Sequence, residues 1–257
     1  MLEPILVFDS GIGGLSVLTE IRKLLPQHDY HYLFDNARLP YGDLSEQDLV
    51  NGCVALIEQQ VAKINPSIVV VACNTASTLV LPALRDRLSI PVVGVVPAIK
   101  PAATISVKKR IGLLATPGTV KRDYTNELIN QFAHDCQVIL FGSSELVLMA
   151  EEYVAQGEIN QTQLANILEP IKQADMDVLV LGCTHFPIIA QQIQQILGDD
   201  IKLLDSGSAI ANRVKSLIQS TNKSSGHLAV SYTREITAGL YKALTSYGFT
   251  SVNHITG

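Results

Sequence analysis

Short runs of aliphatic residues alternate along the chain with longer stretches whose apolar residues recur every three or four positions. The short runs are nearly continuous in valine, isoleucine and leucine, which is typical of parallel strands covered by helices on both faces. The predicted strands are ILVF, HYLFD, IVVVA, PVVGV, RIGLLA, QVILF, DVLVLG, IKLLD and HLAVSY. Helical spacing lies between them, most clearly over residues 45–64, 119–133, 161–174 and 206–218. The pattern predicts an α/β fold with mainly parallel central sheets flanked by helices.

Two stretches of the sequence are similar to each other. IVVVACNTAS at 68–77 and VLVLGCTHFP at 178–187 each lead from an apolar strand into a cysteine that a threonine follows within two positions. Two related halves of the chain would explain this similarity. In open parallel sheets ligands bind beyond the carboxyl ends of the strands, so the ends of these two strands are candidate sites.

A proline-rich stretch at 91–102 is the predicted crossing between the halves, because proline interrupts both helices and sheet ladders. A second crossing is expected where the chain returns. The sequence therefore predicts a first α/β domain formed by residues 1–97 and 207–257, and a second formed by residues 98–206. The segment 220–226, STNKSSG, is predicted to be an exposed linker loop.

Composition and charge exclude several classes of function. With 257 residues and 47% hydrophobic content, the chain can bury the core of one large domain or two smaller ones. A net charge of −5 and scattered basic residues leave no surface suited to phosphate backbones, so nucleic acid is not an expected partner. No apolar run has membrane-spanning length and the start lacks a basic secretory region, so we expect a cytoplasmic protein that does not contact a membrane.

The cysteines and lysines bear on cofactors. Cysteines at 53, 73, 136 and 183 form no CxxC pair, so free thiols are expected rather than a metal site or a disulfide framework. A pyridoxal phosphate enzyme needs a lysine on a site loop, whereas the lysines lie mostly in helical stretches or surface turns, apart from Lys100. We therefore expect neither a metal nor a cofactor.

The first predicted strand ends in an acid and runs into glycines, in the sequence ILVFDSGIGGLSVL at 5–18. A dinucleotide-binding loop needs a glycine where Ser16 stands, and Asp9 would repel a pyrophosphate. The glycines are therefore expected to let backbone amides approach a small anionic group such as a carboxylate. A tight strand-to-helix turn that binds nothing is the alternative.

Cysteine follows two predicted strands, in the sequences CNT at 73–75 and CTH at 183–185. A helix is expected to begin just after each, and its amide donors and dipole favour a thiolate with a lowered pKa. Each thiol is thus a candidate base or nucleophile, with neighbouring uncharged donors such as Ser10 suited to orienting a ligand. A buried core thiol is the alternative for a single cysteine of this kind.

If the two halves face each other across a cleft, Cys73 and Cys183 lie on opposite sides of whatever the cleft holds. This arrangement suits stereoinversion, in which one base removes a proton from a tetrahedral carbon and the opposite acid delivers one to the other face. Asp9 beside Cys73 and His185 beside Cys183 are candidates for setting the two protonation states. Simple helix-capping roles for Asp9 and His185 remain open.

Several motifs together resemble those of the glutamate racemases, within the aspartate/glutamate racemase superfamily. They are DSGIGGLSVL, DNARLPYG, ACNTAS, GVVPAIKPA, LLATPGTV, LGCTHFP and LLDSGSAIA, in that order. The resemblance implies a cofactor-independent racemase that interconverts L-glutamate and D-glutamate with two bases, the D-isomer supplying peptidoglycan synthesis. It also implies two pseudo-symmetric α/β domains with the active site in the cleft between them, and a homodimer is one assembly that it allows.

Carried onto this chain, the resemblance implies that Cys73 and Cys183 are the catalytic thiols, each deprotonating one enantiomer. Asp9 and His185 would assist them, and Glu151 would assist near the second thiol, with Glu145 and Glu152 as rivals for that position. The implied substrate-binding residues are Asp9, Ser10, Tyr41, Gly42, Asn74, Thr75, Thr116, Thr119, Thr184 and His185.

Three other functions stay open at this point. A racemase for another acidic amino acid such as aspartate would use the same thiols with a shorter pocket. A hydrolase or amidase would use Cys183 as nucleophile and His185 as base, which makes Cys73 dispensable. A binding protein that is not an enzyme would keep both cysteines as packing residues.

The start of the chain generates a first prediction. Only a few residues precede the first predicted strand, so we expect the chain to lack the N-terminal extension that accompanies activation by a cell-wall precursor in some racemases. The racemisation rate should therefore be the same with and without the UDP-linked muramyl-alanine precursor. Clear stimulation in a rate assay would contradict this expectation.

Overall fold

The structure is a computed structural model that describes residues 3–218 and 225–255. One sheet consists of β1 (Ile5–Asp9), β2 (Tyr30–Phe34), β3 (Ile68–Val71), β4 (Val92–Gly94), β9 (Leu228–Tyr232) and β10 (Ser251–His254). A second sheet consists of β5 (Arg110–Ala115), β6 (Gln137–Gly142), β7 (Val178–Leu181) and β8 (Lys202–Leu204). The strand pairs in both sheets are parallel. This confirms the predicted α/β fold with parallel sheets.

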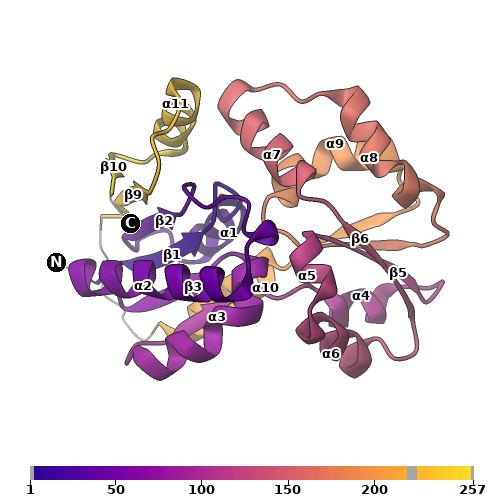
Figure 1. Cartoon of the computed structure of the whole chain (residues 1–257), viewed down its shortest axis with the longest axis horizontal. Helices are drawn as coiled ribbons and strands as arrows, with labels where there is room; N and C mark the ends of the chain where they lie inside the picture. Colours follow the sequence, from indigo (N-terminus) through magenta and orange to yellow (C-terminus); the bar gives the residue numbers. More distant parts are fainter. Residues whose placement is uncertain (1–2, 219–224, 256–257) are drawn as a thin grey trace.

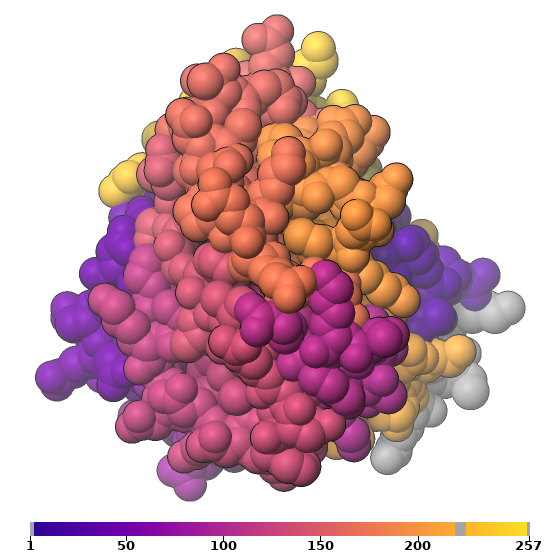
Figure 2. All heavy atoms as spheres, turned by 90° about the vertical axis from the view of Figure 1, so that its right-hand side faces the viewer, coloured from indigo at the N-terminus to yellow at the C-terminus, as the bar shows by residue number. Residues whose placement is uncertain are grey.

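Each sheet lies in its own lobe of the molecule, as Figure 1 shows. The first lobe contains α1 (Leu15–Leu24), η1 (Tyr41–Asp43), α2 (Glu46–Ile64), α3 (Asn74–Arg87), α10 (Gly207–Leu217) and α11 (Ala238–Tyr247). The second contains α4 (Ile99–Ile105), α5 (Pro117–Lys121), α6 (Asp123–Phe132), α7 (Glu145–Gln156), α8 (Gln161–Gln173), η2 (Phe186–Ile189) and α9 (Ala190–Leu197). Seen from the side of the second lobe, residues of that lobe form the central face and the first lobe appears at its flanks (Figure 2).

Four strands of the first sheet have the same order as the four strands of the second. The first runs β10-β9-β2-β1-β3-β4 and the second runs β6-β5-β7-β8, so β1 to β4 correspond in order to β5 to β8. The strands β3 and β7 that precede the two similar cysteine motifs therefore occupy equivalent positions. The similarity seen in the sequence reflects two lobes built on the same plan.

All nine predicted strands are present, and the structure adds β10, which the pattern did not reveal. Its sequence, SVNH, has one aliphatic residue, and the strand lies at the edge of the sheet, where burial imposes no hydrophobic alternation. The helix predicted over 119–133 is in fact two helices, α5 and α6, with Arg122 in an extended conformation between them.

Alternate residues of β1 enter cores on opposite faces of the first sheet. Ile5 and Val7 pack with α1 and α10, whereas Leu6 and Phe8 pack with α2 and α3. Burying a side chain of this size contributes roughly 1.5–3 kcal/mol each, which explains why a strand covered on both faces is apolar throughout. A fully buried central strand holds its carboxyl end in a fixed place, and that end carries Asp9.

The connections between lobes lie close together. Ser206 Oγ donates a hydrogen bond to the carbonyl oxygen of Val96, which joins the segment leaving the first lobe to the segment returning to it. The domain boundaries predicted at 97/98 and 206/207 fall in these two segments and stay a proposal. Of the predicted linker loop 220–226, residues 220–224 lie outside the described part of the chain.

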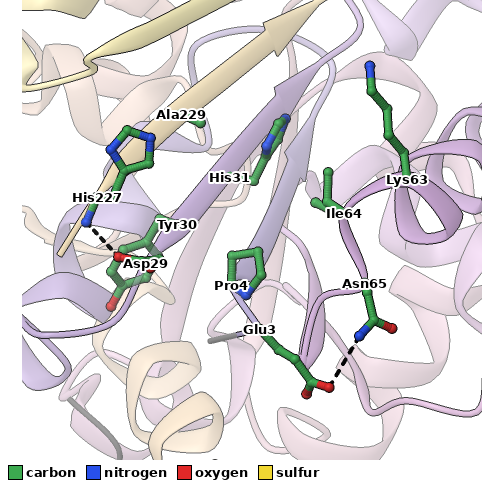
Figure 3. Close-up of a pocket in the computed structure, with 10 residues that line it drawn as sticks. All are labelled: Glu3, Pro4, Asp29, Tyr30, His31, Lys63, Ile64, Asn65, His227 and Ala229. Carbon is green, nitrogen blue, oxygen red and sulfur yellow. Dashed lines mark hydrogen bonds between the residues drawn. The ribbon is translucent and has the colours of Figure 1, made fainter. Parts of the chain in front are cut away.

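A surface pocket lies at the amino-terminal end of the first sheet, where β1, β2 and β9 begin (Figure 3). Its wall includes His31, whose pKa is lowered to about 4 by burial and by the nearby positive charges of Lys63 and His227. Ligands of parallel sheets bind at the opposite, carboxyl ends of the strands. This pocket is therefore remote from the cysteine motifs.

Candidate active site

The sequence motifs meet at the carboxyl ends of the central strands of both lobes. Asp9 ends β1 and Cys73 follows β3 in the first lobe, while Thr116 follows β5 and Cys183 follows β7 in the second. Both thiols are buried, with Cys73 4% and Cys183 5% exposed. Also buried here are Asp9, Ser10, Asn74, Thr75, Thr116, Thr119, Thr184 and His185. The two lobes thus enclose a polar site that is largely shielded from solvent.

Hydroxyl groups join the lobes on the Cys73 side. Thr75 Oγ1 from the first lobe lies 3.0 Å from Thr116 Oγ1 and 3.3 Å from Thr119 Oγ1 of the second. Thr116 also caps α5, because its side chain accepts a hydrogen bond from the amide of Thr119. Each hydroxyl can donate as well as accept, so the cluster can reorient toward a ligand without any fixed charge.

Two buried polar atoms near Cys73 have no hydrogen-bond partner among the described residues. They are Asp9 Oδ1 and Asn74 Nδ2. Buried polar atoms are nearly always paired, since an unpaired one costs about 1–3 kcal/mol. An acceptor and a donor left unpaired beside a thiol indicate where the polar groups of a ligand would bind. An amino acid has the ammonium and carboxylate that would satisfy them.

Cys73 precedes α3 as its N-cap residue, and its Sγ lies 3.7 Å from Ser10 Oγ. The expectation of a lowered pKa is wrong for this thiol. Burial raises the pKa of Cys73 well above its ordinary value, the negative charges of Asp9 and Cys183 add to the increase, and the amide of Ala76 opposes it. Desolvation therefore outweighs the helix dipole, and Cys73 is held as a neutral thiol.

Asp9 lies between the two thiol loops. Its Oδ2 accepts hydrogen bonds from the amide of Gly14 at 2.6 Å and from Thr184 Oγ1 of the second lobe at 3.3 Å. Burial raises the pKa of Asp9 to about 6, while the positive charge of His185 and donors that include the Gly14 amide oppose the rise. Asp9 thus contacts the site and holds the amide of Gly14 before α1. The alternative that Asp9 is simply the N-cap of this helix is wrong, because Gly14 is the N-cap and no side chain caps α1.

Cys183 is the first member of a chain of side-chain contacts. Its Sγ lies 3.7 Å from His185 Nδ1, and His185 Nε2 lies 2.8 Å from Glu151 Oε1. Burial disfavours a charged imidazole, but hydrogen bonds and attraction from Cys183 and Glu151 prevail and raise the pKa of His185 well above its usual value. No α-helix begins directly after Cys183, and the His185 side chain caps nothing at η2, so its capping alternative is not observed.

Glu151 is the acid that reaches this histidine. It extends from α7, and its Oε1 also accepts a hydrogen bond from the amide of Ile12 in the first lobe at 2.7 Å. Its rivals lie elsewhere: Glu145 accepts from Gln163, and Glu152 is exposed. The geometry therefore favours Glu151 among the three.

The glycines after β1 accommodate the second lobe. A methyl group on Gly11 would overlap Glu151 Oε1, and one on Gly13 would overlap the ring of His185. The expectation that backbone amides here approach a small anionic ligand stays a prediction, but the amide of Ile12 does bind a carboxylate. That carboxylate belongs to Glu151 of the same chain. Close contact with the second lobe therefore explains the glycines of this loop without a bound dinucleotide.

Tyr41 and Gly42 lie next to the site in different ways. The Tyr41 hydroxyl donates to Asp35 Oδ2 at 2.5 Å, and its ring packs against Phe8 in the first-lobe core. Gly42 lies against Thr116, which would be 2.7 Å from a Cβ on this glycine. The side chain of Tyr41 is thus occupied within its own lobe, and the backbone at Gly42 is what approaches the second lobe.

Sequence reasoning missed three residues that join or support the site. Arg122 donates to the carbonyl oxygen of Thr75 and to Thr78 Oγ1 across the lobes. Ser16 Oγ donates to the carbonyl oxygen of Thr184 at 2.9 Å. The Tyr32 hydroxyl donates to the carbonyl oxygen of Gly11 in the glycine loop. Arg122 and Tyr32 lie outside the motifs, and the contacts of all three residues join groups that become neighbours only when the chain folds.

The described residues contain no group of three or more histidine, cysteine, aspartate or glutamate side chains that could hold a metal ion. The side chains of the site are thiols, hydroxyls, one amide, two carboxylates and an imidazole.

None of the described helices has the length and apolar character needed to span a membrane.

Two lobes that share a four-strand order, each placing a thiol in one buried site, are typical of a racemase of the Asp/Glu/Hydantoin class, and the comparisons agree. The model of the Asp/Glu/Hydantoin racemase family matches residues 13–214. Within that class the chain belongs to the glutamate racemase family. It is 64% identical to the glutamate racemase of Shewanella frigidimarina over 256 residues, which covers 100% of this chain and 99% of the relative.

Solved structures give the same result. The structure of Escherichia coli glutamate racemase in complex with L-glutamate and the activator UDP-MurNAc-ala has a TM-score of 0.93 and 43% identity, covering 99% of each chain. That of the Francisella tularensis enzyme in complex with D-glutamate has a TM-score of 0.81 and 25% identity, covering 99% of this chain and 97% of the other. The likeness confirms the two-lobed fold that the family resemblance implied.

The close contact at Gly11 generates a prediction. Gly11→Ala should lower kcat by at least about tenfold, because the new methyl group displaces Glu151 from His185 and so weakens acid–base assistance at Cys183. Gly157→Ala is the control: Gly157 has φ 81°, and nothing lies within 4 Å of a Cβ there. It should cost about 1 kcal/mol of stability and leave kcat unchanged. Equal kcat values for the two variants, at comparable melting temperatures, would contradict the assignment.

Proposed function

We propose that this enzyme interconverts L-glutamate and D-glutamate by moving the α-proton between Cys73 and Cys183. One observation carries the proposal: the thiols follow equivalent strands of the two lobes and are buried in one site, each with its own acid–base partner. Cys73 adjoins Asp9, and Cys183 adjoins His185. A single base would return the proton to the face it came from, whereas two bases on opposite faces invert the carbon.

The resting charges favour one thiol as acid and the other as base. Burial keeps Cys73 protonated, and the raised pKa of His185 places an imidazolium whose Nδ1 lies 3.7 Å from Cys183 Sγ. Cys183 then removes the α-proton from one face, and Cys73 delivers its own proton to the other. The electron pair of the broken C–H bond forms the new one. The reverse direction begins with the opposite protonation states.

Substrate recognition is proposed to use the unpaired polar atoms and the hydroxyl cluster. Asp9 Oδ1 would face the ammonium group, and Asn74 Nδ2 with Thr75 and Thr116 would bind carboxylate oxygens. Among the alternatives, glutamate is favoured over aspartate because the relatives of high identity are glutamate racemases. The hydrolase alternative is disfavoured, since it gives the buried Cys73 no role.

The wider role follows from the family. D-glutamate supplies peptidoglycan synthesis, and we propose that the enzyme acts in the cytoplasm on a free small-molecule substrate without a cofactor. The homodimer stays a prediction. Absence of activation by a muramyl precursor also stays a prediction, and the Escherichia coli enzyme, which was solved with such an activator, is the reference for measuring it.

Racemisation in deuterium oxide tests the two-thiol mechanism. We expect solvent deuterium at the α-carbon of the product, because the proton delivered comes from an exchanged thiol. Cys73→Ser and Cys183→Ser should each lose at least about a hundredfold in racemisation, as a hydroxyl is a far weaker acid and base here. Chiral chromatography with mass spectrometry measures both quantities. Normal racemisation by either variant would rule out the mechanism.

The titration of Asp9 predicts a pH dependence. Its pKa is raised to about 6, so the carboxylate that would pair with the substrate ammonium beside Cys73 is protonated as the pH falls below that value. We expect kcat/KM to fall by about tenfold per pH unit below pH 6, while the carboxyl groups of free glutamate stay ionised to about pH 4.3. Asp9→Asn should be slower and should lack this limb. A variant that keeps the same acid limb would assign it to another group.

A further inference from the structure

A tyrosine in the core of the first lobe is hydrogen-bonded to the glycine loop after β1, which contacts Glu151 and His185 beside Cys183. Tyr32 lies on β2 and is fully buried. Its hydroxyl donates to the carbonyl oxygen of Gly11 at 2.6 Å. The amide on the other side of that same peptide group belongs to Ile12, and it donates to Glu151 Oε1 at 2.7 Å. One peptide group therefore connects Tyr32 with Glu151.

We propose that Tyr32 is a positioning residue for Cys183, acting through the Gly11–Ile12 peptide, Glu151 and His185. The proposal rests on the racemase mechanism above. Tyr32 is in the first lobe, whereas Cys183 is in the second. Through Tyr32, the first lobe can therefore orient the acid–base group of the second lobe when the two lobes are in contact.

The Tyr32 hydroxyl fixes the orientation of this peptide group. A hydrogen bond to the carbonyl oxygen polarises the peptide and makes its N–H a stronger donor, so the Ile12 amide binds Glu151 more firmly. The hydroxyl also lies 2.8 Å from the position of a Cβ on Gly14, so the loop rests closely on it. Without the hydroxyl, the Gly11 carbonyl would be buried with no donor, and the peptide could turn its N–H away from Glu151.

Tyr32 is held rigidly enough for this role. Its ring packs against Phe34 and Phe249, with centroids 5.8 Å and 6.1 Å away. Burial raises its pKa well above the usual value, and the negative charges of Asp9 and Glu151 add to the increase. The phenol therefore remains a donor over the working pH range.

The same strand provides a matched control. Tyr30 lies two positions earlier, so its side chain points to the same face of the sheet. It is also buried, and its hydroxyl donates to the backbone carbonyl oxygen of Leu25 at 2.7 Å. Tyr30→Phe thus removes a buried hydrogen bond of the same type, but Leu25 ends a helix away from the site.

The first experiment measures the ionisation of Cys183 without relying on turnover or on access of a reagent to the closed site. In a Cys73→Ser background, the ultraviolet absorbance of the Cys183 thiolate is followed across pH as the difference from the Cys73→Ser, Cys183→Ser variant. Tyr32→Phe should move the midpoint of this profile upward by about half to one pH unit, since a loosened Glu151 holds the His185 cation less well. Tyr30→Phe should leave the midpoint unchanged, although both variants should lower the melting temperature. Equal midpoints in the two variants would overturn the proposal.

Kinetics of the enzyme with both cysteines give the second measurement. Tyr32→Phe should lower kcat by about fivefold to tenfold with KM changed less than about twofold, because the loss lies in proton transfer rather than in substrate binding. Tyr30→Phe should change neither. In a Glu151→Gln background, Tyr32→Phe should cause no further loss of kcat, since the residue through which it acts has been altered. Independent, multiplicative losses would overturn the proposed route.

These outcomes are separate from those that test the mechanism. If either cysteine variant racemises normally, the two-thiol reaction fails. If racemisation needs both thiols but Tyr32→Phe behaves as Tyr30→Phe does, the reaction stands and Tyr32 has a purely structural role.

Discussion

The contact between the glycine loop of the first lobe and Glu151 and His185 of the second is the interaction on which the site depends. The Ile12 amide binds Glu151, Glu151 binds His185, and His185 faces Cys183. The loop can make this contact because it has no side chain at Gly11 or Gly13. The second thiol therefore has its acid–base partner in place when the lobes are together, and separating the lobes breaks the link to Ile12.

The burial of the site, to which this contact contributes, lowers the stability of the fold and at the same time controls which groups are protonated. Burial raises the pKa of Asp9 from 3.8 to about 6, so above pH 6 the ionised carboxylate reduces the stability of the fold by roughly 3 kcal/mol relative to an exposed one. That is a large part of the 5–15 kcal/mol by which a domain is usually stable. The same exclusion of water strengthens every charge interaction in the site and keeps Cys73 protonated. The site thus sacrifices stability for control over where protons lie.

The sequence predicted the fold well because its central strands are apolar throughout and its helices are periodic. It also identified the residues that follow those strands, since parallel strands bring their carboxyl ends together. It could not predict which groups would contact one another between lobes: the partner of the glycine loop is Glu151, more than a hundred positions away. The predicted direction of the Cys73 pKa shift was wrong for a related reason. The sequence shows where the helix begins, but it does not show how deeply the thiol is buried. Tyr41 lies in one of the family motifs and was expected to bind substrate, but its hydroxyl donates to Asp35.

Two lobes on one plan do not give two equivalent thiols. The strands β1 and β5 correspond, and their register against β3 and β7 matches Asp9 at the end of β1 with Ala115 at the end of β5, so the first lobe supplies a carboxylate where the second has only a methyl group. Likewise Thr75 stands two positions after Cys73, whereas His185 stands two positions after Cys183. A symmetric pair of thiols in symmetric surroundings would share a proton without preference. The differences at these two pairs of positions give one thiol an acid beside it and the other a cation, which allows one to begin as donor while the other begins as acceptor.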